Sequence, residues 1–170
     1  RHRGNPHRAK LGTGLGEVKQ VASNRRVIGE NGKLKYWRGS TTRDPKARDE
    51  PEGLIDANVA MLSFYSDDKP LVAVCYYATH PMSYYQSVKA NADFVGLARD
   101  VREKVTGVPH IYFTGAAGNV AAGKYNDGAH ENRQIFADRL AAGMALAWKN
   151  TEKHAIDVDE VRWKTVGAAL

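Results

Sequence analysis

Residues 59–78 read VAMLSFYSDDKPLVAVCYYA, and this stretch decides the fold class. Val59 to Tyr65 is rich in residues that favour β-strands, and Ser66 to Lys69 has the composition of a turn. Leu71 to Ala78 is continuously apolar, which is typical of a buried strand. We therefore expect a β-hairpin whose second arm is buried.

The chain after this hairpin alternates between helix and strand patterns. Apolar residues recur at helical spacing from Phe94 to Val105, and Asp93 stands where an N-cap residue is expected. The pattern predicts a short buried strand at residues 108–113 and a second helix at residues 131–149. It predicts a last strand at residues 161–165. The order predicts an α/β fold with α+β layers: a mixed β-sheet with a buried hairpin and packed helices.

Length and composition narrow the class of protein. The 170 residues suffice for about one domain with its own core. Hydrophobic residues make up 42% and charged residues 26%, which argues against a disordered or fibrous chain. The longest apolar run, residues 71–78, is too short to span a bilayer. Because the chain begins with Arg1 rather than Met, we expect a removed leader or a piece of a longer protein.

The net charge of +6 is distributed unevenly along the sequence. Residues 1–50 carry thirteen Lys and Arg against five Asp and Glu, whereas residues 51–170 carry twelve against fourteen. Residues 1–53 are also rich in Gly, Asn and Pro, with a turn signal at Gly12 to Gly16. We expect residues 1–53 to be an irregular basic lead-in segment and residues 54–170 to form the α/β core.

The lead-in segment could serve as a basic arm. Its candidate residues are Arg25, Arg26, Lys33, Lys35 and Arg38. Such an arm could meet phosphates or an anionic membrane surface, or it could be a solvated face. Nucleic-acid binding is not expected, because aromatic residues are sparse there and no nucleic-acid motif accompanies them.

Three segments contain residues suited to catalysis. His80 ends the apolar strand and Pro81 stops the strand directly afterwards, so the imidazole stands at a sheet edge, suited to metal binding or general-base catalysis. A structural, hydrogen-bonded histidine is the alternative reading. Asp93 could cap the helix and also hold the second nitrogen of a metal-binding histidine.

The third segment is a loop of small residues that follows the strand at 108–113. It reads TGAAGNVAAGKYN from Thr114 to Asn126 and lacks the spacing of a phosphate-binding P-loop or of a G-x-S-x-G elbow. The backbone at Gly118 and Asn119 could approach a ligand closely, and its amides could stabilise an oxyanion. Lys124, Tyr125 and Asn126 add polar groups on the far side of this loop.

The three segments together resemble the neutral/alkaline, non-lysosomal ceramidase family. The family has an apolar strand ending in His-Pro, an Asn-x-Asp helix start, and a strand leading to a Gly-Asp-x-Ser-Pro-Asn loop. The matching positions here are His80-Pro81, Asn91-Ala92-Asp93 and Gly118 to Gly123. The similarity covers residues 54–126, and residues 16–26 resemble the bacterial ceramidase-like branch more loosely.

The resemblance implies a zinc-dependent amidase that cleaves the N-acyl bond of ceramide. In the family, two His, a Glu and a Tyr hold the zinc; His80 is the one ligand that maps onto this chain, which would then be part of a larger catalytic domain. For such a reaction the candidate catalytic residues are Asp93, Gly118, Asn119 and Tyr125, and Lys124 and Asn126 are the candidates for binding the lipid amide. The resemblance also slightly favours a secreted or cell-envelope protein.

One departure from the family keeps other functions open. The serine to which the family assigns a catalytic role falls at Ala121 here. The leading hypothesis is a zinc-dependent amidohydrolase that acts through a zinc-bound water. The alternatives are a metal-dependent hydrolase of an ester or another acyl compound, and a non-catalytic module that binds an anionic partner or membrane.

Overall fold

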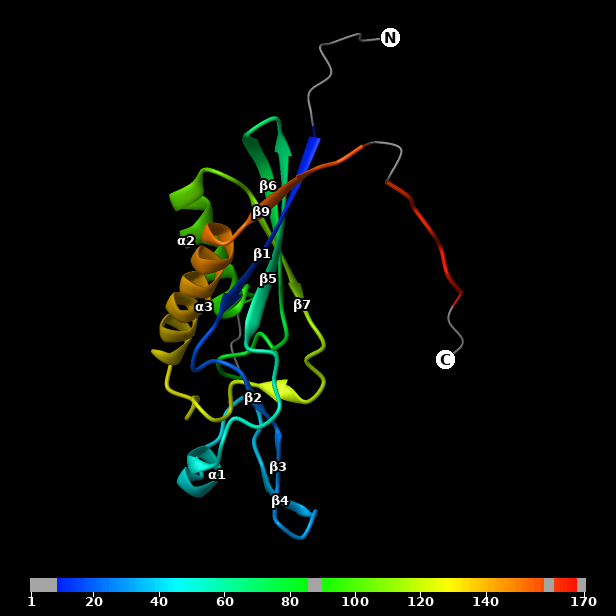
Figure 1. Cartoon of the computed structure of the whole chain (residues 1–170). Coiled ribbons are helices and arrows are strands. Elements are labelled where there is room, and N and C mark those ends of the chain that lie inside the picture. The colour runs from blue at the N-terminus through cyan, green and yellow to red at the C-terminus, as the bar shows by residue number, and fades with distance from the viewer. Residues whose placement is uncertain (1–8, 86–89, 158–160, 168–170) are drawn as a thin grey trace.

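A five-stranded mixed β-sheet forms the centre of the molecule (Figure 1). The computed structural model describes residues 9–85, 90–157 and 161–167. In spatial order the strands are β7 (His110–Thr114), β6 (Lys69–Tyr77), β5 (Asn58–Ser66), β1 (Ala9–Glu17) and β9 (Glu152–Ala155). The expected hairpin is β5–β6, and the expected strand before the glycine-rich loop is β7. The predicted α/β class with a mixed sheet is confirmed.

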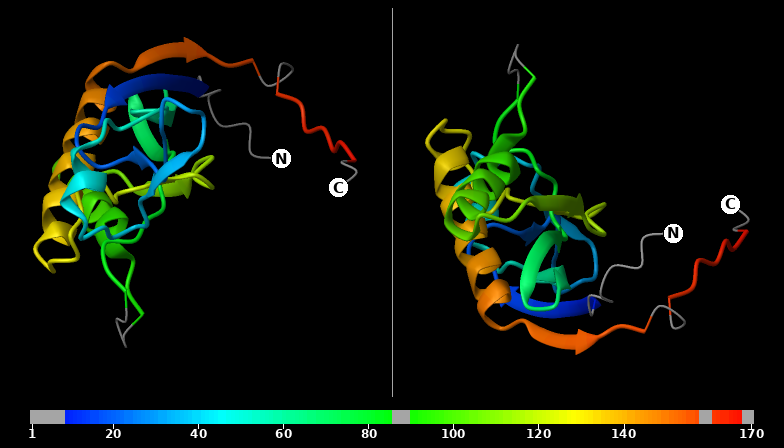
Figure 2. Two further views of the ribbon diagram at one scale, coloured as in Figure 1. Left: turned by 90° about the horizontal axis from the view of Figure 1, so that it is seen from below. Right: turned by 90° about the horizontal axis from the view of Figure 1, so that it is seen from above.

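Two helices cover one face of this sheet (Figure 2). Helix α2 (Asp93–Thr106) connects β6 to β7, which pair in parallel, whereas the other neighbouring strands are antiparallel. A parallel pair needs such a crossover, because the chain must return to the starting end of the sheet. Helix α3 (Asn132–Lys149) lies against α2 and β1. Both helices lie where the periodicity predicted them.

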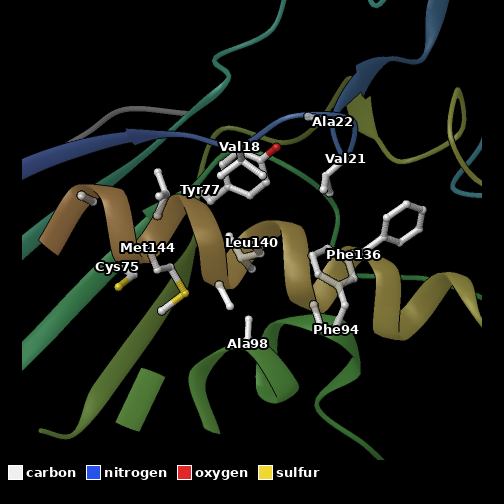
Figure 3. Packing of buried hydrophobic residues seen from close by; sticks show 14 of the residues in the cluster. Val18, Val21, Ala22, Cys75, Tyr77, Phe94, Ala98, Phe136, Leu140 and Met144 are labelled. Atoms are coloured by element: carbon white, nitrogen blue, oxygen red, sulfur yellow. The ribbon is translucent and has the colours of Figure 1, made fainter. Parts of the chain in front are cut away.

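The hydrophobic core lies between the helices and the sheet (Figure 3). The rings of Phe94 and Phe136 meet edge to face at 5.8 Å between their centroids, and neither is exposed to solvent. Cys75 is fully buried in the same core, and burial raises the pKa of its thiol to about 12. The thiol therefore acts as a small core residue, as its apolar neighbours in the sequence predicted.

Strand β1 corrects the expectation that residues 1–53 are irregular. Gly12, Gly14 and Gly16 alternate along this strand and face the helices. A Cβ on Gly14 would lie 2.1 Å from the carbonyl oxygen of Ala147 in α3, and a Cβ on Gly16 equally close to that of Gly143. The glycines therefore mark close packing of a helix on a strand, not a turn.

Two short ladders and a short helix lie at the lower end of the molecule in Figure 1. Strand β2 (Ser23–Asn24) pairs with β8 (Val120–Ala121), and β3 (Arg26–Ile28) forms a hairpin with β4 (Leu34–Trp37). Helix α1 (Pro45–Asp49) is capped by the Asp44 side chain. The β2–β8 ladder joins the basic lead-in to the glycine-rich loop.

Arg38 follows β4, and the expectation that it belongs to an exposed basic arm is wrong. Its side chain is buried, and its guanidinium donates to the carbonyl oxygens of Asn24, Pro51 and Glu52 at 2.8–3.1 Å. Burial lowers the pKa of this guanidinium. Arg38 therefore holds the segment after α1 in place and does not meet phosphates or a membrane.

Two further expectations are wrong. Residues 161–167 form neither helix nor strand; the last strand is β9, which pairs with β1. Helix α2 begins at Asp93 itself, with Ala92 at the N-cap position and Asp93 in the left-handed region at φ 51°. The Asp93 carboxylate accepts from the amide of Phe94 at 2.7 Å and also from the backbone amide of Ser83.

The sheet face opposite the helices is apolar and exposed. Its large side chains are 39–57% exposed; they are Leu15, Leu62, Phe64, Tyr76, Ile111 and Phe113. The second arm of the hairpin, β6, is thus buried on one face only. The continuous apolar run in its sequence reflects two apolar faces, one of which is open to solvent here.

Candidate functional site

His80 lies just beyond the end of β6, where the sequence predicted an imidazole at a sheet edge. Its backbone amide and its Nδ1 both lie 3.0 Å from the carbonyl oxygen of Val120 in β8. Because a carbonyl oxygen can only accept, Nδ1 carries a proton, which in a neutral imidazole leaves the lone pair on Nε2. This is the orientation in which a second-shell carbonyl prepares a histidine to bind a metal.

Asp93 does not support His80 but holds the segment that follows it. Both of its carboxylate oxygens accept from the backbone amide of Ser83 at 3.1 Å. The Asn126 side chain donates to the carbonyl oxygen of Ser83 at 2.5 Å, and Arg133 Nε donates to its hydroxyl at 3.0 Å. Every polar group of the buried Ser83 is thus hydrogen-bonded to a side chain from another segment. We call this arrangement the Ser83 clamp.

The clamp continues into α3 and its preceding loop. Arg133 lies 3.5 Å from Asp93 Oδ2, and its guanidinium stacks over the ring of Tyr84 at 3.9 Å. Tyr84 in turn stacks on His130, with 4.1 Å between ring centroids. Sequence reasoning missed Arg133 and the role of Ser83, because their proximity depends on the tertiary fold.

The middle of the glycine-rich loop contacts the basic lead-in. The Asn119 side chain donates to Asn24 Oδ1 at 2.6 Å and accepts from Arg26 at 3.0 Å. Arg25 donates from its backbone amide to the Asn119 carbonyl at 2.8 Å, and its guanidinium lies 3.4 Å from the Gly118 carbonyl. A Cβ on Gly118 would meet nothing within 4 Å, so the space on that side of the loop is open.

The three polar residues that end this loop contact other parts of the protein. Lys124 Nζ donates to the carbonyl oxygens of Arg48 and Glu50 at 2.7 and 2.6 Å. The hydroxyl of Tyr125 donates to Glu52, and burial, with this hydrogen bond, raises the pKa of the phenol. These contacts tie the loop to the segment around α1.

Asn126 is fully buried, and its hydrogen-bonding groups are directed at the protein. Besides Ser83 it donates to the Ser40 carbonyl at 2.7 Å, and its oxygen accepts from Gly128 and Asn132 at 3.0 Å each. Direct substrate binding by Lys124 and Asn126 stays a prediction, and the structure gives both a role in holding loops together.

The structure thus groups the predicted residues in four places. His80 meets the β8 backbone, and Gly118 and Asn119 meet the basic lead-in. Asp93 and Asn126 meet at Ser83, and Lys124 and Tyr125 face the segment around α1. Within residues 9–85, 90–157 and 161–167, no cluster of three or more His, Cys, Asp or Glu is placed to hold a metal ion. In the same part of the chain, no helix is long and apolar enough to cross a membrane.

Comparison with known proteins supports the resemblance at the level of the fold. No family model matches the chain, and no curated protein matches it. Among solved structures, it is similar to neutral ceramidase from Pseudomonas aeruginosa and to a ceramidase complexed with C2. Each is 18% identical over 85% of this chain, with a TM-score of 0.58, and the chain spans 23% of their length. The chain therefore shares the fold of one part of neutral ceramidase, as its motifs predicted.

Proposed function

We propose that this chain is the part of a zinc-dependent, ceramidase-like amidohydrolase that supplies one imidazole ligand to the metal. The whole enzyme would hydrolyse the N-acyl bond of ceramide or a related lipid amide. The observation that carries the proposal is the His80 ring on a fold shared with neutral ceramidase. The Val120 carbonyl holds Nδ1 of this ring, and Nε2 has no hydrogen-bond partner among the described residues, which leaves it able to coordinate a metal.

The residues of this chain fit zinc as one ligand of about four. Imidazole nitrogen is a preferred zinc ligand, and the remaining ligands would come from outside the described residues. Bound zinc would supply a nucleophilic water and polarise the scissile carbonyl. The Val120 carbonyl would fix the tautomer of His80, and the Ser83 clamp would fix the segment on which His80 stands.

The glycine-rich loop would bind the substrate at its scissile acyl carbonyl. Open space at Gly118 allows a substrate to approach the backbone, whose amides can stabilise developing negative charge. Ala121, at the position of the family's serine, is buried, and its carbonyl accepts from the Ser23 hydroxyl at 2.8 Å. This chain therefore offers no hydroxyl nucleophile there, and hydrolysis would depend on water.

The same observation at Ala121 favours a second candidate function. A site without the loop hydroxyl could act on an ester or another acyl compound that is easier to cleave than an amide. A panel of fluorogenic esters and lipid amides distinguishes the two candidates, since the ceramidase-like proposal requires cleavage of the amides.

Zinc content tests the proposal. The full-length gene product, its His80→Ala variant and its His154→Ala variant are dialysed and analysed for zinc per chain. His154 lies exposed on β9, so its variant is the matched control. We expect near-stoichiometric zinc and ceramide hydrolysis in the natural protein and the control, and loss of both in His80→Ala. Absence of zinc from the natural protein would overturn the proposal.

A further inference from the structure

The β3–β4 hairpin projects from the lower end of the molecule, away from the main sheet and both long helices (Figure 1). Three large apolar side chains on it are about half exposed: Ile28 and Leu34 at 54% each and Trp37 at 47%. Isolated exposed apolar residues need no explanation, but a group at the tip of a protruding element is typical of an interaction surface.

The strand register gathers these side chains on one face. Ile28 pairs with Leu34 and Arg26 with Trp37, on either side of a register shift between Val27 and Ile28. Residues paired across an antiparallel ladder share a face. Val27, which points to the other face, is buried against the body of the protein. The exposed face of the hairpin therefore carries an aliphatic pair at its tip and an aromatic ring nearer its base.

Basic side chains surround this apolar group. Arg26, Lys33 and Lys35 are exposed, and the guanidiniums of Arg25 and Arg26 lie 4.5 and 5.6 Å from the centre of the Trp37 ring. We call the six residues Arg26, Ile28, Lys33, Leu34, Lys35 and Trp37 the hairpin patch.

Two carboxylates lie close to the patch and reduce its charge. Glu30 lies in the hairpin turn, and Glu50 Oε1 pairs with Lys35 Nζ at 2.5 Å. Among the described residues, the cations Arg26 and Lys33 on the hairpin pair with no carboxylate, and neither does Arg25 beside the ring. The patch therefore keeps an excess of positive charge around an apolar tip.

We propose that the hairpin patch docks on an anionic lipid bilayer. Ile28 and Leu34 would enter the boundary between headgroups and acyl chains, Trp37 would lie at headgroup level, and the cations would meet lipid phosphates. Aliphatic side chains between cations suit a bilayer, whereas single-stranded nucleic acid would need several aromatic platforms for its bases.

Docking in this way would also orient the candidate site. Strand β3 follows β2, which pairs with β8, and Arg26 donates to Asn119 in the glycine-rich loop. The loop would then lie close to the surface from which a lipid arrives. The docking proposal does not depend on hydrolysis, so it can fail or succeed independently of the proposed function.

Vesicle binding tests the apolar part of the patch. The chain is mixed with vesicles of phosphatidylcholine alone or of phosphatidylcholine and phosphatidylglycerol in equal parts, and bound protein is measured by flotation. We expect the natural chain to bind the anionic vesicles. The double variant Ile28→Ser and Leu34→Ser should bind them at least about tenfold more weakly than the natural chain. Leu71→Ser, 50% exposed near the start of β6 and outside the hairpin, should bind like the natural chain.

Charge variants and salt test the electrostatic part. Lys33→Gln should bind anionic vesicles about fivefold more weakly, whereas Lys104→Gln, in the last turn of α2, should bind normally. Added salt should weaken binding of the natural chain. Circular dichroism establishes that each variant is folded.

Three outcomes would overturn the docking proposal. The first is failure of the folded natural chain to bind anionic vesicles, including the case in which it binds an oligonucleotide instead. The second is undiminished vesicle binding by the double serine variant. The third is an equal loss of vesicle binding in Leu71→Ser, which would show that binding does not depend specifically on the hairpin.

Discussion

Three side chains from three segments converge on Ser83, three residues after His80. Ser83 comes two residues after Pro81 and lies in no helix or strand, so no ladder of backbone hydrogen bonds fixes its position. The clamp replaces such a ladder with bonds from Asp93, Asn126 and Arg133. A histidine on a loop can bind a metal with defined geometry only when its supporting residues are held in this way.

Replacing Asn126 should destabilise the protein. In Asn126→Ala the buried carbonyl groups of Ser40 and Ser83 lose their donor, and each unpaired buried group costs about 1–3 kcal/mol. We expect urea unfolding to show a loss of about 2–4 kcal/mol, against about 0.5 kcal/mol or less for Asn58→Ala on the exposed start of β5. Equal losses in the two variants would show that the clamp does not contribute.

His110 should make stability depend on pH. Its imidazole is buried at the start of β7, with Nδ1 2.8 Å from the Val108 carbonyl and with Nε2 unpaired among the described residues. Burial lowers its pKa, and the nearby guanidiniums of Arg102 and Arg99 act in the same direction. The hydrogen bond to the Val108 carbonyl and the Glu103 carboxylate act against this shift without reversing it. The folded protein therefore binds fewer protons than the unfolded chain once the pH falls below about 6.5.

The sign of this effect is that acid weakens the fold. The contribution of His110 is complete above the pKa of the unfolded imidazole and is lost as the pH falls toward the lowered folded value. The variant His110→Asn keeps a donor for the Val108 carbonyl but cannot titrate. Unfolding free energies from urea titrations between about pH 8 and 5 should fall more steeply for the natural chain than for this variant. The same slope in both would contradict the assignment.

Residue types and their order in the sequence identified several residues of the candidate site but not the residues to which they are hydrogen-bonded. His80 could be chosen from the sequence because a strand that ends in His-Pro fixes where the imidazole stands. Asp93 and Asn126 were also chosen, but their observed partner is Ser83, which lies 10 and 43 residues away in the chain. Such contacts depend on how α2, α3 and the loops pack, so they cannot be predicted from a local sequence pattern.

At the scale of elements, helix α3 rests directly on the backbone of β1. Alternate glycines on the strand face Gly143 and Ala147 on the helix, so the two elements approach without intervening side chains. Periodicity predicted α2, α3 and the β5–β6 hairpin because apolar side chains mark them. Strand β1 escaped prediction because its buried positions are glycines, which carry no hydrophobic signal and suggest turns.

Gly16→Ala should therefore destabilise the molecule strongly. The new Cβ would lie 2.1 Å from the backbone oxygen of Gly143, and backbone cannot move aside as a flexible side chain can. We expect a loss of at least about 3 kcal/mol in urea unfolding. Gly118→Ala is the matched control, because the space on that side of the loop is open, and it should change stability by less than about 1 kcal/mol. A mild effect at Gly16 would mean that α3 can shift away from β1.

At the scale of the whole molecule, the fold has one covered and one uncovered sheet face. Antiparallel sheets often face water on one side, but then that side is usually polar. Here Leu15 and Leu62 line a largely apolar hollow of about 730 Å³ across β1, β5 and β6. Folding therefore leaves apolar surface exposed in the native state, and no partial unfolding is needed to reach it.

The native chain should for this reason bind the dye ANS, which fluoresces on apolar surfaces. We expect enhanced ANS fluorescence under conditions where urea titration shows the protein fully folded. The double variant Leu15→Ser and Leu62→Ser should lower the enhancement at least about twofold, because both side chains border the hollow. Leu71→Ser, equally exposed but outside the hollow, should lower it little. If ANS binds only after partial unfolding, or equally well to the double variant, then this face is not the accessible apolar surface of the folded protein.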